Sequence, residues 1–125
     1  IEAILSNRSN IKKIVSIVHK EIRKKMKLFL KKNKNKKIVI LDIPLLLENK
    51  INNKKDILIF VESKRKDIEK RLKDRGNFNN NLITKFRSIQ YKLSFKKKKS
   101  QFIIKNEFTK KNIRKDIKNI LKKIL

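Results

Sequence analysis

Two acids and a proline follow the most apolar stretch of this chain. The run Ile38-Val39-Ile40-Leu41 is uninterrupted, and Asp42, Pro44 and Glu48 come directly after it. Ligands of open α/β sheets bind beyond the carboxyl ends of strands, so either acid there could orient a hydroxyl group or a helix end. The alternative interpretation is that Asp42 only caps a turn and that the leucines between Pro44 and Glu48 belong to the core.

Arginines form a second candidate group. Arg71 and Arg75 are four residues apart in a predicted helix, and Arg87 follows in the next one. Guanidinium groups make forked contacts with phosphate oxygens, and a basic lid over a nucleotide would use them to offset charge during phosphoryl transfer. The alternative is a solvated helix face. Arginine is scarce in this lysine-rich chain yet paired at this point, which favours the functional interpretation.

Two more polar positions are less specific. Asn106 follows the last predicted strand, where its amide could read the edge of a base, although an asparagine in a turn is the commoner explanation. His19 lies near the buried face of a long predicted helix. For this histidine a structural role is favoured over a catalytic one.

Composition limits the possible functions. The chain has 125 residues, so it is one domain or most of one, and 38 Lys and Arg against 11 Asp and Glu give a formal charge of +27. Clustered cations favour nucleic-acid binding. The other explanation is compositional drift, because Lys, Ile and Asn dominate and lysines lie along nearly every segment rather than in one patch. Aromatic residues at 6% also provide few surfaces for stacking bases.

Several classes of site and location are disfavoured. The chain has no cysteine and one histidine, so it cannot build a disulfide framework, a thiolate site or a histidine-based metal cluster. No apolar run approaches the roughly 18 residues of a membrane span, and no signal peptide is visible at the start. We therefore expect a cytoplasmic protein that does not bind membranes.

The elements that would position these residues alternate between helix and strand. We predict strands at 38–41, 57–61 and 101–104. Before the first strand we predict a helix end at 1–5 and a helix from Ile11 capped by Ser9 or Asn10. After the second strand we predict a helix capped by Ser63 that runs through Arg75 with Gly76 as its stop, a helix opening at 79–81 and a short helix ending in the basic run 96–99, and after the third strand a last helix capped by Thr109. Strands that are apolar on both faces lie inside parallel sheets. The class is therefore α/β.

In this order the motifs resemble one family over essentially the whole chain. The matching pieces are His-X-X-Ile-Arg at 19–23, Asp-Ile-Pro-Leu-Leu-X-Glu at 42–48, Arg-Leu-X-X-Arg at 71–75, Arg-X-X-Gln at 87–90 and Ile-X-Asn at 104–106. The chain is similar to the C-terminal two-thirds or so of dephospho-CoA kinases. The Pro-Leu-Leu-X-Glu stretch is the most specific piece, and the others gain weight from their order.

The resemblance implies roles for these residues. It implies that the family's dephospho-CoA is bound by His19, Arg23, Asp42, Pro44, Leu45, Leu46 and Glu48, and that ATP and the lid involve Arg71, Arg75, Arg87, Gln90, Lys96 and Asn106. ATP with Mg²⁺ is the implied co-substrate, dephospho-CoA and ATP are the implied partners, and no specific nucleic acid is expected. Lys20, Leu47, Lys105 and Phe108 depart from the family pattern, which commonly has proline, an aromatic residue, an acid and glycine there.

The resemblance also implies that a part of the family's fold is missing. The chain contains one glycine, so it cannot contain the Gly-rich phosphate loop of such a kinase. We expect a single incomplete kinase domain over 1–125, a partial P-loop NTPase-type three-layer parallel sheet. It would comprise substrate-side helices (1–33), core strands and the Pro44 loop (38–61), a lid (63–100), and the last strand and helix (101–125).

This missing part has a physical consequence. In the family's fold the first strand lies between the strands that correspond to 38–41 and 57–61. Without it both lose a ladder partner, at a cost of roughly 1–3 kcal/mol for each buried backbone group left unpaired. We expect the chain, which does not begin with Met, to follow an upstream segment that carries the phosphate loop and the catalytic acid. Alone it should be marginally stable and catalytically inactive.

Overall fold

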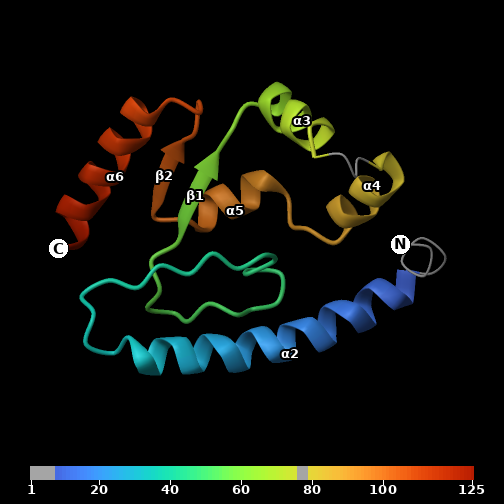
Figure 1. Cartoon of the computed structure of the whole chain (residues 1–125), viewed down its shortest axis with the longest axis horizontal. Helices are drawn as coiled ribbons and strands as arrows, with labels where there is room; N and C mark the ends of the chain where they lie inside the picture. The colour runs from blue at the N-terminus through green and yellow to red at the C-terminus, as the bar shows by residue number, and fades with distance from the viewer. Residues whose placement is uncertain (1–7, 76–78) are drawn as a thin grey trace. The chain divides into compact units, whose positions relative to one another are not determined.

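A computed structural model describes residues 8–75 and 79–125 (Figure 1). The first compact unit contains one long helix, a loop and most of a shorter helix, and the second contains the other helices and both strands.

 
The elements are α2 (Arg8–Lys32), β1 (Ile59–Glu62), α3 (Arg65–Lys73), α4 (Asn80–Ser88), α5 (Leu93–Lys99), β2 (Phe102–Lys105) and α6 (Lys110–Ile124). The first unit comprises Ile1–Asn52 and Asn81–Gln90, and the second comprises Asn53–Asn80 and Tyr91–Leu125, so α4 begins in the second unit and continues in the first. The predictions for 1–5 and for Gly76 lie outside the described residues.

Helix α2 follows from its apolar spacing. Apolar residues recur in steps of three and four from Ile14 to Phe29, without glycine or proline between them. Lys31 and Lys32 lie in the last turn, where cations interact favourably with the helix dipole. The predicted caps are wrong, because the helix begins at Arg8 and so contains both Ser9 and Asn10. The chain continues the helix through these polar residues instead of starting it after them.

The strand predicted at 38–41 does not form. Residues 38–43 have no regular secondary structure, and the side chain of Ile40 is 83% exposed. A strand is stable only when a neighbouring strand accepts its ladder hydrogen bonds and covers its faces. Among the described residues, the sheet contains β1 and β2 alone. The apolar run therefore stays extended without a partner.

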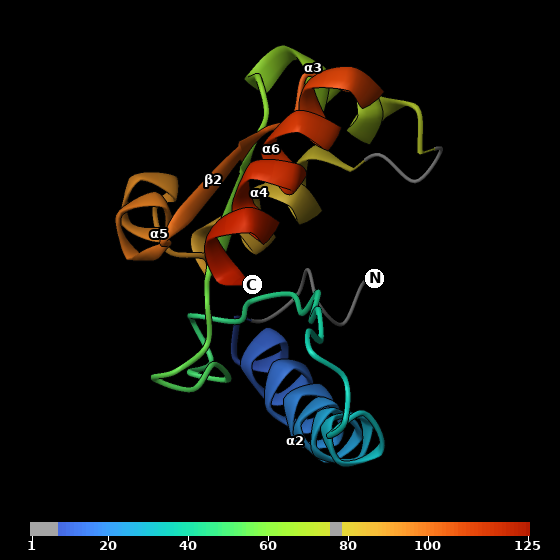
Figure 2. The same cartoon turned by 90° about the vertical axis from the view of Figure 1, so that its left-hand side faces the viewer.

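The second unit contains a small parallel sheet. β1 and β2 pair in parallel, with Ile59 opposite Phe102 and Glu62 opposite Lys105. Figures 1 and 2 show α6 running beside β2, and the two elements are in contact. These strands confirm the predictions for 57–61 and 101–104, each shifted by one or two residues. The α/β class with a parallel sheet is likewise confirmed.

Two predicted helix ends need correction. α3 has Lys64 as its N-cap rather than Ser63, and it ends at Lys73, so Arg75 follows the helix in a turn. Because Lys64 has no side-chain oxygen, the cap position makes no side-chain hydrogen bond. Thr109 is the N-cap residue of α6 as predicted, although its hydroxyl makes no capping hydrogen bond.

The core of the described chain is thin. Its buried residues are Ile51 at 3% exposure, Ile120 at 7% and His19 at 7%. Large apolar side chains elsewhere are exposed, among them Ile17 at 68% and Val61 at 55%. Because hydrophobic stabilisation scales with the apolar area removed from water, little is gained here. Within the described ranges, no helix has the length and apolar character needed to cross a membrane.

Candidate functional site

In the first unit, Asn49 joins α2 to the loop that follows Pro44. Its side-chain Nδ2 lies 3.0 Å from Nε2 of His19 and donates to the backbone oxygen of Leu45, also at 3.0 Å. A primary amide has two N–H donors, one for each of these acceptors. The contact with His19 fits the tautomer in which Nε2 accepts.

Arg23 adds a second connection between the same two elements. One turn beyond His19, its guanidinium donates through Nη2 to the backbone oxygen of Asn49 and through Nη1 to that of Lys50, at 3.5 Å. Hydrogen bonds from a charged donor are stronger than neutral ones. His19 and Arg23, predicted as ligand contacts, are thus brought together as a clamp on the loop.

The loop itself ends in a motif usual at helix C-termini. The N–H of Ile51 donates to the oxygen of Leu46 at 3.0 Å, and the N–H of Lys50 donates to that of Leu47 at 3.1 Å. Lys50 has φ 49, so this is a Schellman arrangement with lysine at the position where glycine is preferred. Leu45, at φ 54, is a second left-handed residue. Neither left-handed position carries a glycine that would have marked the turn in the sequence.

A cleft lies beside this clamp. It has a volume of about 520 Å³ and is lined by Val15, Ser16, His19, Lys20, Arg23 and Asn49. Two of the lining side chains are cations and one is a hydroxyl, so the cleft suits a ligand with anionic groups. The Nδ1 atom of His19 is buried there without a hydrogen-bond partner among the described residues.

The other residues predicted for this site belong to the Pro44 loop itself or directly precede it. Asp42 and Pro44 are exposed, whereas Leu46 and Glu48 are half-buried. Their predicted contact with a substrate stays a prediction. Asn49 is the residue that sequence reasoning missed, and its only signal was an amide placed directly after the Pro-Leu-Leu-X-Glu stretch.

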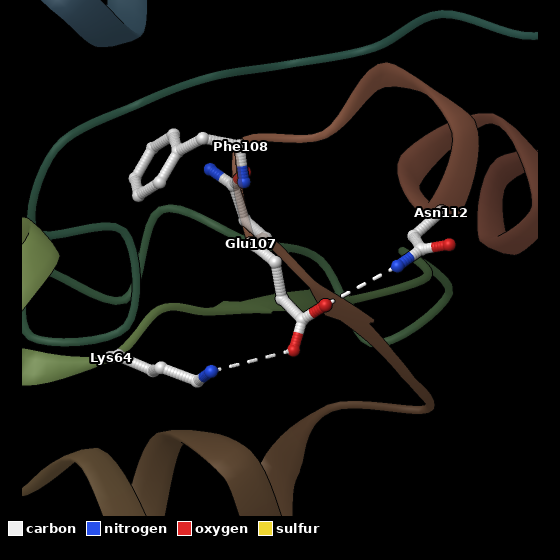
Figure 3. A network of polar contacts seen from close by, with 5 residues as sticks. Lys64, Glu107, Phe108 and Asn112 are labelled. Carbon is white, nitrogen blue, oxygen red and sulfur yellow. Dashed lines mark hydrogen bonds and ion pairs between the residues drawn. The ribbon is translucent and has the colours of Figure 1, made fainter.

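A second candidate site lies at the carboxyl ends of β1 and β2. Glu107 accepts a hydrogen bond from Asn112 Nδ2 at 3.2 Å and pairs with Lys64 Nζ at 3.7 Å (Figure 3). The N–H of Phe108 donates to the side-chain oxygen of Asn106 at 3.0 Å. These contacts connect the loop after β1 to the loop after β2, at the edge where ligands of parallel sheets bind.

Arg71 reaches this loop from α3. Its guanidinium carbon lies over the ring of Phe108, 3.8 Å from the ring centroid. Phe108 has φ 58, in the left-handed region that favours glycine. The structure therefore brings Arg71 and Asn106, both predicted for the nucleotide side, to the same loop. Phe108 connects them, and its signal in the sequence was its departure from the glycine expected there.

The remaining lid residues are more dispersed. Arg75, Arg87 and Gln90 are exposed, and Lys96 is half-buried in α5. Arg87 and Gln90 belong to the first unit, whereas Arg75 and Lys96 belong to the second. Near Lys96, the neighbouring Lys97 is paired with Glu62 at 2.6 Å. On α3, Glu69 raises the pKa of Arg65 through a hydrogen bond and its charge.

Residues 8–75 and 79–125 bring together no group of three or more His, Cys, Asp or Glu side chains that would hold an ion.

Comparisons with known proteins converge on one family. A sequence model of the family described as dephospho-CoA kinase matches residues 1–112. A curated dephospho-CoA kinase of Wolbachia pipientis wMel is 29% identical over 119 residues, which is 94% of this chain and 60% of the relative. That of Wolbachia sp. subsp. Brugia malayi (strain TRS) is 29% identical over 114 residues, 90% of this chain and 58% of the relative. The chain thus spans about three-fifths of the relatives' length.

Proposed function

This chain belongs to the dephospho-CoA kinase family, and we propose that it forms the acceptor side and the lid of an enzyme that phosphorylates dephospho-CoA. The reaction transfers the γ-phosphoryl group of ATP to the 3′-hydroxyl of dephospho-CoA. The observation that carries the proposal is the clamp between α2 and the Pro44 loop. It joins two of the family's motifs, centred on His19 and Pro44, through side-chain contacts of Asn49 and Arg23.

The clamp supports a positioning role for His19 and Arg23. Both side chains make hydrogen bonds to the loop, so they fix the backbone from Pro44 to Lys50 relative to α2. Lys20 and Ser16 also line the adjoining cleft. They are not among the side chains that hold the loop. We assign that cleft to phosphate groups of the acceptor, where a cation and a hydroxyl provide charge-assisted hydrogen bonds.

The lid arginines would act by electrostatics. In phosphoryl transfer the protein mainly positions the groups and offsets the developing negative charge. Arg71, Arg75, Arg87 and Lys96 are the cations assigned to ATP and the lid, and Gln90 and Asn106 contribute amides. The phosphate loop and the catalytic acid are assigned to a further segment, because the single glycine of the chain rules out a Gly-rich loop within it.

The open edge of β1 supports the need for that segment. In the described part of the chain β1 pairs with β2 on one edge only, and Ile59 and Val61 are 43% and 55% exposed. A parallel strand added at the other edge would complete the ladder and cover apolar surface. We propose that this strand leads into the phosphate loop, and that the 125-residue chain is inactive without it.

Complementation tests the proposal. The 125-residue chain is purified alone and together with the segment of the Wolbachia pipientis relative that precedes its matched region. ADP formation is then measured with and without dephospho-CoA. We expect no turnover by the chain alone and acceptor-dependent turnover by the mixture. A segment whose phosphate-loop lysine is changed to alanine is the control.

Two results would contradict the proposal in different ways. Turnover by the chain alone would show that it is not an inactive fragment. A mixture that neither turns over nor binds dephospho-CoA in calorimetry would remove the kinase assignment. Binding without turnover would keep the acceptor site and reject only the complementation by this segment.

A second candidate function, nucleic-acid binding, is favoured by one surface formed by α5 and the two residues before it. Tyr91 and Phe95 make an edge-to-face contact with centroids 5.0 Å apart, and Lys99 Nζ lies 5.7 Å from the Phe95 centroid. Tyr91, Lys92, Ser94, Phe95 and Lys98 line a cleft of about 540 Å³. Exposed aromatic rings among lysines suit single-stranded nucleic acid, whose bases stack and whose phosphates pair with cations.

This second candidate needs a test that net charge alone cannot satisfy, because a chain with charge +27 is retained by any polyanion. Binding of a single-stranded oligonucleotide is compared between the wild type, Phe95→Ala and the matched variant Phe86→Ala on α4. A loss of about tenfold or more confined to Phe95→Ala would support base stacking. Equal binding by all three proteins would mean that charge alone accounts for the interaction.

A further inference from the structure

The loop after β2 has an unusual residue at its tightest point. Phe108 adopts φ 58, although a left-handed conformation costs an L-residue with a Cβ roughly 1–2 kcal/mol. Its N–H is held by the side-chain oxygen of Asn106 at 3.0 Å. The neighbouring Glu107 is tied to Lys64 and Asn112 (Figure 3). Two hydrogen bonds and an exposed ion pair therefore constrain the loop that carries the Phe108 ring.

The Phe108 ring in turn holds the guanidinium group of Arg71 in place. The Arg71 guanidinium lies 3.8 Å from the ring centroid, a contact distance for stacked groups, so nothing fits between them. Arg71 itself is exposed. One side of its guanidinium is thus covered by the ring while the side chain remains accessible to solvent. An otherwise flexible arginine is held at the carboxyl end of the sheet by an aromatic surface.

We propose that Phe108 is a positioning residue that holds Arg71 as a stacking surface for the base of a nucleotide. Guanidinium planes stack on bases as well as on aromatic rings. A base placed on the open side of Arg71 would complete a ring–guanidinium–base stack. The inference rests on the proposed ATP-binding role of the lid, and it adds a residue, Phe108, that stands where the family commonly has glycine.

The alternative is that the ring keeps Arg71 away from the nucleotide. The two possibilities predict opposite effects when the ring is removed. If Phe108 positions Arg71, a smaller residue weakens binding of the base. If the ring only occupies Arg71, a smaller residue frees the guanidinium and strengthens binding. Glycine at 108 removes the ring without disfavouring the left-handed backbone, so it separates these outcomes even if alanine disturbs the fold.

The experiment compares ATP with inorganic triphosphate by calorimetry on the 125-residue chain. Their affinity ratio reports the contribution of the nucleoside. We expect the wild type to prefer ATP by about tenfold, as a single stacked base provides. Phe108→Gly should lower this preference by about two- to fivefold, the range of an exposed cation–π contact. Phe108→Tyr, which keeps a ring, should retain it.

Arginine variants test the other half of the stack. Arg71→Lys keeps the charge but removes the planar guanidinium, so it should lower the ATP preference while leaving triphosphate affinity within about twofold. Arg65→Lys is the matched control on the same helix, where the guanidinium is bound to Glu69. The Arg71 Nε–H resonance should also move downfield in Phe108→Gly, because the ring no longer shields it.

Each outcome decides the inference. An unchanged or stronger ATP preference in Phe108→Gly would overturn it, and so would a wild type with no preference for ATP over triphosphate. An Arg71 resonance that is the same in the wild type and in Phe108→Gly would show that the stack does not exist in solution. These results differ from failure of the proposed kinase function, which is judged by turnover in the complementation assay.

Discussion

Two apolar runs of similar sequence adopt different structures in this molecule. Ile38–Leu41 and Ile57–Val61 are both uninterrupted and rich in β-branched residues. The second contributes to β1, which pairs in register with β2. The first stays without regular structure, with Ile40 83% exposed. The difference lies in the available partner and not in the residues of the runs themselves.

The comparison shows that whether a β-branched run forms a strand depends on its place in a sheet. β-Branched side chains fit a pleated surface that neighbours cover, and they gain little when no neighbour is present. The first unit is instead held by side chains, which connect α2 to the Pro44 loop through His19, Arg23 and Asn49. One unit therefore depends on a backbone ladder and the other on a small polar network.

A pair of proline substitutions should give the largest contrast between the two runs. The N–H of Asn106 donates to Glu62 in β1, and that of Phe102 donates to Leu58 directly before β1. Strand alternation directs the N–H of Ile104 the same way. Ile104→Pro should destabilise the second unit by about 1–3 kcal/mol, because a ladder acceptor loses its donor. Ile40→Pro should change stability by less than about 0.5 kcal/mol.

Urea unfolding followed by circular dichroism measures both variants. Equal losses from the two prolines would break the comparison, since they would mean that Ile40 also takes part in a ladder. The contrast becomes sharper when the complementing segment is added. If that segment supplies the missing strand, Ile40→Pro should then lower the activity of the mixture, although it leaves the isolated chain unchanged.

Removing the centre of the polar network should have the next largest effect. Asn49→Ala leaves Nε2 of His19 and the oxygen of Leu45 without the amide that now serves both. Because His19 is buried at 7% exposure, we expect a loss of about 1–2 kcal/mol. Amide hydrogen exchange over residues 45–51 should accelerate. Asn35→Ala, in an exposed turn, is the control and should leave exchange unaffected.

Helices and strands were easier to predict from the sequence than the segments with which they pair. Local spacing sufficed for α2, β1 and β2, because periodicity and β-branching report on the neighbouring residues. The missing strand at 38–41 and the caps at Ser9 and Ser63 were not predictable in this way. Pairing depends on chain segments distant in sequence, and capping on where a helix is stopped by its surroundings.

The candidate sites show the same division. Motif residues His19, Arg23 and Arg71 were identifiable from type and order, but their contacts were not. Arg23 binds backbone oxygens of the loop, and Arg71 lies over Phe108. Such contacts depend on left-handed residues at Leu45, Lys50 and Phe108, none of which is a glycine that would have revealed them.

A smaller effect of opposite sign should come from the end of the Pro44 loop. Lys50 occupies the left-handed position of the Schellman motif at φ 49. Lys50→Gly relieves the Cβ penalty but adds chain entropy to the unfolded state, so the net gain should be about 0.5–1 kcal/mol. Thermal unfolding measures it. Lys54→Gly, outside this motif, should instead leave stability unchanged or slightly lower it.

The smallest effect should come from the ion pair beside the sheet. Lys97 Nζ lies 2.6 Å from Glu62 Oε1, but the two side chains are 42% and 38% exposed. Exposed pairs of this kind contribute less than about 1 kcal/mol and are weakened by salt. Glu62→Gln should therefore destabilise the second unit slightly at low salt and not at all in concentrated sodium chloride. A large, salt-independent loss would mean that this unit, like the first, depends on a side-chain contact rather than on its backbone ladder.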